Sequence, residues 1–474
     1  MAERITRELV ALRAAAELRP GQVVNLGVGL PTLVSNYVTP ERGVILHSEN
    51  GLLGFGPYVA EGEEDRDLIN ARADFVTLLP GAAAIDHADA FGISRSGRLD
   101  VAVLGGLQVS EKGDLANWMI PERGIGSPGG ALDFANQAKR LIIVMEHTLG
   151  EEQPKILKEC TYPLTARQKV KLIVTDLAVI EVTSQGLLLK EVAPGWSVEA
   201  VQRLTGPALL VSPELKEMDF SLPDYAPVDK VYPTALSAVS DIFDGATILM
   251  DGFGGLGGMA HYLMLALREQ GAKGLTIVGN TAGIARVASF GTPPKPGLQA
   301  IDHSILVENG QIKKAIASFP VSPSPSRPTA FEEAYRRGEV EMELAPQGTL
   351  AERIRAGGFG VGAFYTPTGA GTLVAEGKES KVINGRVHIL ESAIRGDFAL
   401  IRAHKADRLG NLVYRGTSRN FNATMARAGD VTIAEVDEIV APGGLDPDEI
   451  VTPGVYVDRI VKRPADFLPF ERVD

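Results

Sequence analysis

Cysteine and long apolar runs are the features that this 474-residue sequence most clearly lacks. Cys160 is the only cysteine, which excludes an intrachain disulfide framework, and we expect it to be a thiol in the core. No apolar run reaches the roughly 18 residues that a membrane-spanning helix needs. The N-terminal residues carry Glu3 and Glu8 within a helical pattern, unlike a secretory signal peptide. A composition of 45% apolar and 22% charged residues then predicts a globular cytoplasmic enzyme.

Clusters of lysine and arginine along the sequence are also absent, and the formal net charge is −12. This argues against a nucleic-acid partner, because phosphate contacts need such clusters. The G-x-x-x-x-G-K-[ST] motif of a phosphate-binding loop is missing, as is the G-x-S-x-G elbow of a hydrolase. The histidines are scattered without zinc-ligand spacing, so the sequence indicates no metal. His47 and Ser48 are neighbours that a strand would point to opposite faces, and we interpret them as packing and capping groups.

The length favours two domains, because one core seldom grows beyond about 250–300 residues. Four prolines without a helical or strand period fill residues 211–233, so we place a linker at 212–232 between domains spanning 1–211 and 233–474. Both halves show three matching patterns in one order, which indicates two domains of one fold. The matching segments are VVNLGVGLPT and ATILMDGFGGLGG, SEKGDLANW and ADRLGNLVY, and LIIVMEHT and VTIAEVDEIV.

Short apolar strand candidates alternate with helical stretches in each half. This alternation predicts an α/β fold, with two related open domains that contain mostly parallel sheets. Ligands of such sheets bind near the carboxyl ends of the strands, where we therefore expect the functional residues.

A glycine-rich loop carries the residues Gly252, Gly254 and Gly257 of a G-x-G-x-x-G pattern, between a predicted strand and a predicted helix. That context is typical of dinucleotide binding and leaves a nicotinamide oxidoreductase open. The fingerprint also needs an acid near the end of the next strand, where this sequence has Asn280. The loop instead favours backbone N–H contacts to another phosphate or carboxylate. The negative net charge likewise predicts that backbone donors or single cations hold any anionic ligand.

The segment LHSENGLLGFGP, residues 46–57, places Glu49 directly before an Asn-Gly turn. Taken alone, Asn50 and Gly51 would make the turn and Glu49 would be a solvated rim residue. The segment resembles the active-site signature of family I coenzyme A transferases, in the β part of the 3-oxoacid (succinyl-CoA:3-ketoacid) type. The chain as a whole is similar to β-like and α-like halves fused in β then α order. Further β-like segments are NLGVGLPT, LGGLQVSEKGDLANWMIP, GGALDFA and IVMEHT, and α-like segments are APQGTLAERIRAGGFGVGAFYTPTGAGTLV, KADRLGNLVYRGTSRNFN and GLDPDEIVTPGVYVDRIV.

The resemblance implies that Glu49 is a nucleophile. Its carboxylate would attack an acyl-CoA thioester to give a mixed anhydride, and the released thiolate would convert the anhydride into an enzyme-CoA thioester. An acceptor acid would reverse these steps in a ping-pong scheme, which needs no metal and no permanently bound cofactor, since coenzyme A is a substrate. The implied substrates are a short acyl-CoA of the 3-oxoacyl or succinyl class and a small carboxylic acid.

The resemblance also implies the surroundings of the nucleophile. Backbone N–H groups of Gly129 and Gly130 and the side-chain amides of Asn280 and Gln347 would stabilise negative charge on the reacting carbonyl oxygen. The active site would lie in a cleft between the two domains, which keeps water from the intermediates. The loops that would bind coenzyme A carry Gly27, Gly29, Gly252, Gly254 and Gly257.

Several departures from the family pattern bear on the glycine loop and the acyl pocket. Asp251 replaces a glycine, Met259 replaces a proline, and IDHADAF from Ile85 stands where serines are usual. The segment 320–328, rich in serine and proline, predicts a loop. The acyl group therefore stays open, as does assembly into a homo-oligomer. Two alternatives are an acyl-CoA hydrolase on the same scaffold and a ligand-sensing α/β protein without chemistry.

Overall fold

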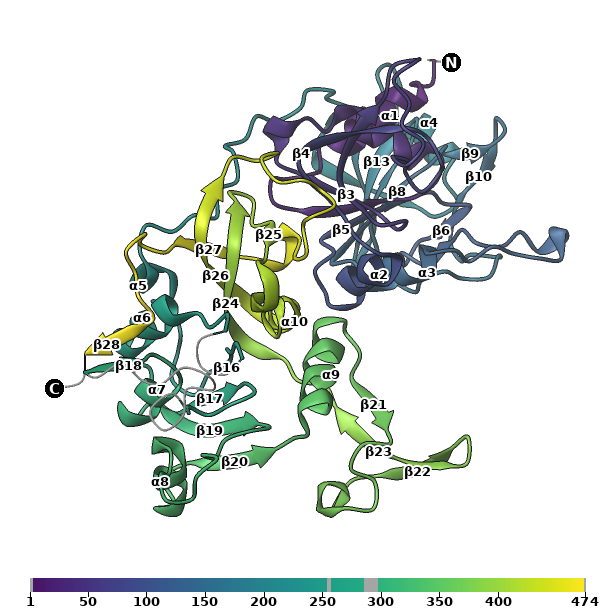
Figure 1. The fold of residues 1–474 in the computed structure, drawn as a ribbon. Helices are drawn as coiled ribbons and strands as arrows, with labels where there is room; N and C mark the ends of the chain where they lie inside the picture. Colours follow the sequence, from purple (N-terminus) through teal and green to yellow (C-terminus); the bar gives the residue numbers. More distant parts are fainter. Residues whose placement is uncertain (1–2, 254–256, 285–296, 473–474) are drawn as a thin grey trace. The chain divides into compact units, whose positions relative to one another are not determined.

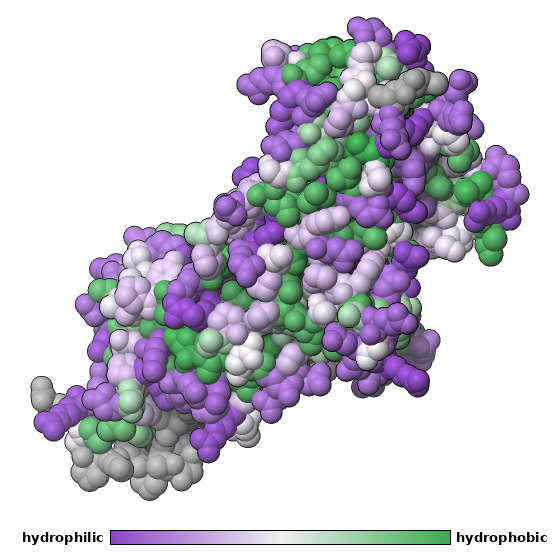
Figure 2. Space-filling model, turned by 90° about the horizontal axis from the view of Figure 1, so that it is seen from above, coloured by the Kyte–Doolittle hydropathy of each residue, from purple (hydrophilic) through white to green (hydrophobic). Residues whose placement is uncertain are grey.

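The chain folds into two compact units, Met1–Val228 and Asp229–Asp474. The computed structural model describes residues 3–253, 257–284 and 297–472, and Figure 1 shows the helices and strands of each unit. No helix of these residues is long and apolar enough to cross a membrane. Hydrophilic residues cover much of the face seen in Figure 2, between smaller apolar patches.

The first unit contains a sheet of ten strands. They are β1 Val23–Leu26, β2 Ile45–Ser48, β3 Leu52–Tyr58, β4 Val76–Ala84, β5 Val101–Leu104, β8 Arg140–Val144, β12 Val170–Val174, β13 Ala178–Thr183, β14 Gly186–Val192 and β15 Leu209–Glu217. Their spatial order is β15-β14-β13-β12-β8-β5-β1-β2-β3-β4. The strands from β12 to β2 run parallel, and β1 and β5 are buried along their whole length. Such continuous burial is typical of parallel strands that are covered on both faces.

Short elements of the first unit surround this sheet. The helices are α1 Arg7–Ala15, α2 His87–Arg95, α3 Ala131–Gln137 and α4 Val198–Arg203, with 3-10 turns η1 Leu30–Tyr37, η2 Pro40–Arg42 and η3 Pro121–Arg123. The minor strands are β6 Gln108–Ser110, β7 Leu115–Ala116, β9 Thr148–Leu149, β10 Gln153–Pro154 and β11 Ile156–Leu157. The predicted N-terminal helix is confirmed as α1, whose Thr6 cap accepts a hydrogen bond from the Leu9 backbone N–H.

The second unit is built on an eight-stranded sheet. Its strands are β16 Thr247–Leu249, β17 Leu275–Val278, β19 Ile312–Ala317, β20 Glu341–Leu344, β24 Gly396–Asp407, β25 Leu412–Val413, β26 Gly429–Val440 and β27 Arg459–Lys462. The order is β20-β19-β17-β16-β24-β26-β27, with β25 paired to β24. All neighbours in the main order are parallel. Alternate residues of β24 enter two different apolar clusters, so the sheet has a core on each face.

The remaining elements of the second unit are shorter. The helices are α5 Ala235–Ala238, α6 His261–Gln270, α7 Ser304–Glu308, α8 Ala330–Arg336, α9 Gln347–Gly358 and α10 Asn422–Ala428, with 3-10 turns η4 Leu373–Ala375, η5 Gly416–Arg419 and η6 Gly454–Tyr456. Two small sheets join β18 Leu298–Ala300 to β28 Phe470–Arg472, and β21 Ala363–Thr366 to β23 Arg386–Ser392 and β22 Ser380–Ile383. Residues 320–328 contain no helix or strand, as their alternating prolines predicted.

The two units share one strand order. In the first unit it is β4-β3-β2-β1-β5-β8-β12, and in the second it is β20-β19-β17-β16-β24-β26-β27. Numbered along the chain, both read 4-3-2-1-5-6-7. The prediction of two related, mostly parallel α/β domains is confirmed. The first and third pairs of repeated sequence patterns lie on equivalent strands, β1 with β16 and β8 with β26. The outer strands differ, because β3 and β4 are antiparallel while β19 and β20 are parallel.

Two sequence-based expectations need correction. Residues 212–217 of the predicted linker belong to β15, which pairs with β14, so the segment without helix or strand begins at 218. β15 is the edge strand of its sheet, and an edge strand tolerates a proline such as Pro213. The prolines of residues 211–233 therefore placed the start of the linker too early. Cys160 is only partly buried and is not a core thiol. Its partial burial nevertheless raises the pKa of the thiol to about 12.

Residues 1–228 and 229–474, expressed as two separate chains, are each expected to fold. The physical reason is that each unit has its own sheet and buried core, as an independent domain requires. Thermal melts followed by circular dichroism should show one cooperative transition for each fragment, with the full chain as the control. A fragment that melts without cooperativity would show that its core depends on the other unit.

Candidate active site

Glu49 lies in a tight turn at the carboxyl end of β2. The backbone N–H of Gly51 donates to the carbonyl of Ser48 at 3.0 Å, and the Ser48 hydroxyl donates to the side chain of Asn50 at 2.5 Å. Gly51 has a φ of 107°, and a Cβ at this position would lie 2.0 Å from the carbonyl oxygen of Ile85. No other residue fits there without moving backbone. The predicted Asn-Gly turn is therefore present, and it fixes the position of the Glu49 backbone.

His47 is buried beneath this turn. Its Nδ1 lies 3.1 Å from the side-chain nitrogen of Asn25, and its Nε2 lies 3.0 Å from the carbonyl oxygen of Ala90. Burial lowers the pKa of His47 to about 4, so the ring is neutral at pH 7. The ring also meets Phe134 edge to face, with centroids 5.6 Å apart. The interpretation of His47 as a packing residue is confirmed.

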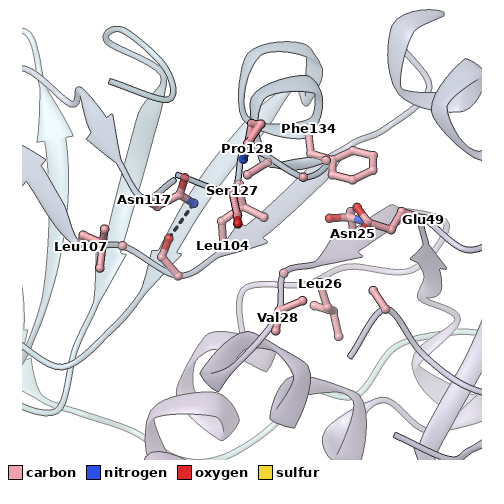
Figure 3. Close-up of a pocket in the computed structure, with 17 residues that line it drawn as sticks. Asn25, Leu26, Val28, Glu49, Leu104, Leu107, Asn117, Ser127, Pro128 and Phe134 are labelled. Carbon is pink, nitrogen blue, oxygen red and sulfur yellow. Dashed lines mark hydrogen bonds between the residues drawn. The ribbon is translucent and has the colours of Figure 1, made fainter. Parts of the chain in front are cut away.

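A cavity of about 360 Å³ opens beside Glu49. It forms where β1, β2 and β5 end and where α3 begins, as expected for the carboxyl edge of parallel strands. Figure 3 shows Phe134 and Ser127 on one side of this cavity, and Leu26 and Val28 on the other. The Asn117 side chain donates to the carbonyl of Gly105 at 3.0 Å and holds the loop after β5.

The pair Gly129 and Gly130 lines the cavity directly against Glu49. A Cβ at Gly130 would lie 2.2 Å from Oε2 of Glu49 and 2.6 Å from Cε2 of Phe134. Gly129 has a φ of 47°, a left-handed conformation that favours glycine. The backbone before α3 therefore passes within contact distance of the carboxylate, which only an unsubstituted residue at position 130 permits.

The carboxylate of Glu49 is half-buried and has no hydrogen-bond donor among the residues described. Burial raises the pKa of Glu49, while His87 lowers it and Asp133 raises it further. His87 begins α2, and its ring lies 5.0 Å from that of Phe91, which in turn stacks on Phe134. The segment IDHADAF thus places a histidine near Glu49. Asp133 and Phe134 lie in α3, within the segment GGALDFA that carries part of the resemblance, but the sequence predicted no individual role for either residue.

Of the two glycines after β1, Gly27 and Gly29, only Gly27 lines the cavity. A Cβ on Gly27 would lie 2.9 Å from the side chain of Leu104. Gly29 is not among the lining residues, and it instead precedes η1 with a φ of 100°. The structure therefore places Gly27, Gly129, Gly130 and Glu49 at one cavity of the first unit.

Asn280 and Gln347 lie at the carboxyl edge of the sheet in the second unit. Asn280 follows β17 and is buried, with its side-chain oxygen accepting a hydrogen bond from the Ser318 hydroxyl after β19. Gln347 follows β20 as the exposed first residue of α9. Both residues share this edge because β17, β19 and β20 are parallel neighbours. By strand order, β17 is the equivalent of β2, so Asn280 occupies the counterpart of the Glu49 position.

Asp251, which replaces a family glycine, is fully buried at the end of β16. Its carboxylate accepts hydrogen bonds from the backbone N–H groups of Gly252 at 2.6 Å, of Thr281 at 3.1 Å and of Asn280. Burial raises the pKa of Asp251 to about 6, and His303 and these N–H groups oppose the rise. Asp251 therefore ties the glycine loop to the backbone of Asn280.

The glycine loop itself is only partly described. Gly252 and Gly257 are close together, since a Cβ on Gly252 would lie 2.3 Å from the carbonyl oxygen of Gly257. Gly254 lies outside the described residues. Oε2 of the buried Glu435 accepts hydrogen bonds from the backbone N–H groups of Tyr262 and Leu263 in the first turn of α6, at 2.8 and 3.0 Å. A pyrophosphate needs those same donors at the helix N-terminus, so dinucleotide binding is not favoured.

No group of three or more His, Cys, Asp or Glu side chains that could hold a metal ion occurs in the described parts of the chain. The chemistry available at the cavity is that of a half-buried carboxylate beside backbone N–H groups. Such a carboxylate can act as a nucleophile toward an activated acyl group.

The family model described as Coenzyme A transferase matches residues 7–204 and 232–463. One subunit of the 3-oxoadipate CoA-transferase of Pseudomonas putida is 47% identical over 234 residues, covering 49% of this chain and 94% of that protein. The other subunit of the 3-oxoadipate CoA-transferase from the same species is 49% identical over 209 residues, covering 44% of this chain and 98% of that protein. One subunit of the probable succinyl-CoA:3-ketoacid coenzyme A transferase of Bacillus subtilis is 48% identical over 232 residues, covering 49% of this chain and 89% of that protein.

The family match covers most of both units, and relatives of two kinds each cover about half of the chain. The chain therefore belongs to the coenzyme A transferase family, with regions similar to both kinds of subunit joined in one polypeptide.

Proposed function

We propose that this enzyme moves coenzyme A between a short acyl-CoA of the 3-oxoacyl or succinyl class and a small carboxylic acid. The observation that carries the proposal is the Glu49 carboxylate, which faces a cavity and has no hydrogen-bond donor among the described residues. A carboxylate without donors keeps its lone pairs available for attack. The names of the relatives, which refer to 3-oxoadipate and to succinyl-CoA with 3-ketoacids, support this substrate class.

The proposed reaction begins when an oxygen of Glu49 attacks the thioester carbonyl carbon. The C–S bond breaks, the CoA thiolate leaves, and an acyl-glutamyl anhydride forms. The thiolate then attacks the glutamyl carbonyl, which releases the donor acid as a carboxylate and leaves a glutamyl-CoA thioester. The acceptor carboxylate reverses both steps, so no net hydrolysis occurs and no metal or redox group takes part.

Each attack places negative charge on a carbonyl oxygen. The backbone beside Glu49, at Gly129 and Gly130, supplies donors for that charge in the proposal, and the side-chain amides of Asn280 and Gln347 serve the same purpose. Asn280 is suited to this role because Ser318 and Asp251 restrict its side chain and its backbone. Gly27 and the loop at Gly252 and Gly257 approach the coenzyme A arm in this scheme.

The nearest alternative is an acyl-CoA hydrolase, in which water takes the place of the acceptor acid. The apolar lining at Leu26, Leu104 and Phe134 favours transfer, because it restricts ordered water around the anhydride. A turnover assay with and without an acceptor acid separates the two activities.

Incubation with acyl-CoA and no acceptor should leave coenzyme A covalently attached at Glu49, because the first half-reaction can finish alone. Hydroxylamine should then inactivate the enzyme only after acyl-CoA has been added. Glu49→Ala should abolish both adduct and transfer, and Glu49→Asp should reduce transfer severely, since it retracts the carboxylate by roughly 1.5 Å. Peptide mass mapping checks the site. Attachment at another residue, or transfer by the alanine variant, would falsify the mechanism.

Gly130→Ala should lower kcat by about a hundredfold or more, because the added methyl would overlap the Glu49 carboxylate and displace it. Gly105→Ala is the matched control. It adds the same methyl to the same cavity, but the nearest atom is the Val28 carbonyl oxygen at 3.9 Å. The control should lose less than about tenfold. Equal losses of kcat in the two variants would mean that the rate depends on the free volume of the cavity and not on the position of the Glu49 carboxylate.

The rate of adduct formation should fall as the pH falls, because only ionised Glu49 attacks. Burial raises the pKa of Glu49, so the midpoint should lie above the value of about 4.3 for an exposed glutamate. Asp133→Asn removes a charge that raises this pKa and should move the midpoint to lower pH. His87→Gln removes a charge that lowers it and should move the midpoint to higher pH. Single-turnover rates across pH test both signs, and shifts in the reverse directions would contradict the assignment.

A further inference from the structure

A second cavity, of about 360 Å³, lies in the second unit and is separate from the Glu49 cavity. We name it the arginine pocket. Its side chains come from β24, β26 and the segment around η5, and Figure 1 shows β24 and β26 side by side. The polar residues that line it are Arg402, His404, Arg415, Thr417, Ser418 and Asp437.

The sheet leaves room for this pocket because its strands differ in length. β16 ends at Leu249, which pairs with Ala399, whereas β24 continues to Asp407. Arg402 and His404 therefore stand beyond the end of β16, on the same face of β24 because they are two residues apart. The loop around η5 supplies the remaining wall.

Positive charge exceeds negative charge around the arginine pocket. Asp437 lies 3.2 Å from a guanidinium nitrogen of Arg402, 3.3 Å from Nδ1 of His404 and 2.5 Å from a guanidinium nitrogen of Arg463. One carboxylate is thus shared by two arginines and a histidine. The neighbouring Glu435 adds a second carboxylate: its Oε2 is hydrogen-bonded to the first turn of α6, and its Oε1 lies 3.9 Å from a guanidinium nitrogen of Arg463.

Arg415 adds a further positive charge. It is exposed, and no carboxylate in the described part of the chain forms an ion pair with it. Thr417 offers a hydroxyl on the same wall, whereas the Ser418 hydroxyl already donates to the carbonyl of Arg415 at 2.7 Å. Guanidinium groups with a hydroxyl donor suit a phosphate, whose oxygens accept several charge-assisted hydrogen bonds. The chain as a whole carries a net charge of −12, so this cluster is a local concentration of positive charge.

The arginine pocket opens at the carboxyl edge of the sheet that carries Asn280. β17 and β24 are separated only by β16, so the two strands lie about 10 Å apart side by side, at roughly 4.8 Å for each spacing. Arg402 lies further along β24 than Ala399, which pairs with the last residue of β16. The cavity is too small for a whole coenzyme A molecule but has the size of a small-ligand site. A ligand that reacts near Asn280 could reach the pocket with a flexible arm such as pantetheine.

We propose that the arginine pocket binds the phosphate groups at the nucleotide end of coenzyme A. This assignment rests on the proposed transferase function. The thioester then lies toward Asn280, and the pantetheine arm crosses the end of β16. Binding of the phosphates lowers KM for acyl-CoA without entering the chemical steps, because the bonds that form and break are at the other end of the molecule.

The test compares two thioesters with the same acyl group, succinyl-CoA and succinyl-pantetheine, which lacks every phosphate. Arg415→Gln should raise KM for succinyl-CoA about tenfold with kcat unchanged, the range expected for one charge-assisted hydrogen bond. The same variant should leave kcat/KM for succinyl-pantetheine within about twofold. Arg419→Gln is the matched control, since Arg419 is exposed in η5 but does not line the pocket, and it should alter neither thioester.

Equal losses of kcat/KM on both thioesters, or no loss on succinyl-CoA, would overturn the assignment. Inorganic phosphate provides a second measurement, because it should compete with succinyl-CoA and not with succinyl-pantetheine. Equal inhibition of both reactions would mean that phosphate acts outside the arginine pocket, which would also overturn the assignment. The wild-type enzyme tests the transferase function separately, since failure to transfer coenzyme A or pantetheine from either thioester refutes that function whatever Arg415 does.

Discussion

The close approach of Gly51 to the carbonyl of Ile85 is the constraint on which the Glu49 cavity of the first unit depends. A Cβ at Gly51 would lie 2.0 Å from that oxygen, so the chain must turn there with a glycine of positive φ. The turn makes β2 and β3 an antiparallel pair, whereas the equivalent β17 is followed by a crossover to a parallel strand. It also ends β2 at the point where Glu49 meets the cavity. One contact therefore sets both the topology and the position of the carboxylate.

Two acids at equivalent sheet edges show how surroundings separate their roles. Asp251 is fully buried and accepts hydrogen bonds from three backbone N–H groups, so its lone pairs are engaged in holding the loop. Glu49 is half-buried beside Gly130 and accepts none within the described residues. Burial raises the pKa of both groups, but only Glu49 has oxygens free toward a cavity. The structure thus leaves one carboxylate open to a cavity and uses the other to hold a loop.

The sequence was informative wherever function depends on residues close together in the chain. The strand, the Asn-Gly turn and Glu49 lie within a few residues, and the repeated patterns foreshadowed the common strand order. The arginine pocket was missed, because Arg402 and Arg415 are separated in sequence and meet Asp437 only through the pairing of β24 with β26. Asp251 was noted as a departure, but its hydrogen bonds to the next strand end could not be foreseen.

A transferase of this kind must satisfy opposed demands at one carboxylate. In the proposed mechanism, deeper burial would protonate Glu49 and remove the nucleophile, whereas full exposure would surround it with water that also hydrolyses the anhydride. Half-burial between Gly130 and Phe134 is the compromise that the first unit adopts. His87 and Asp133 then act on the pKa in opposite directions, so the balance can be adjusted without changing the cavity wall. Both groups lie in helices outside the Glu49 turn, His87 in α2 and Asp133 in α3, so the pKa of Glu49 depends on parts of the chain far from it in sequence.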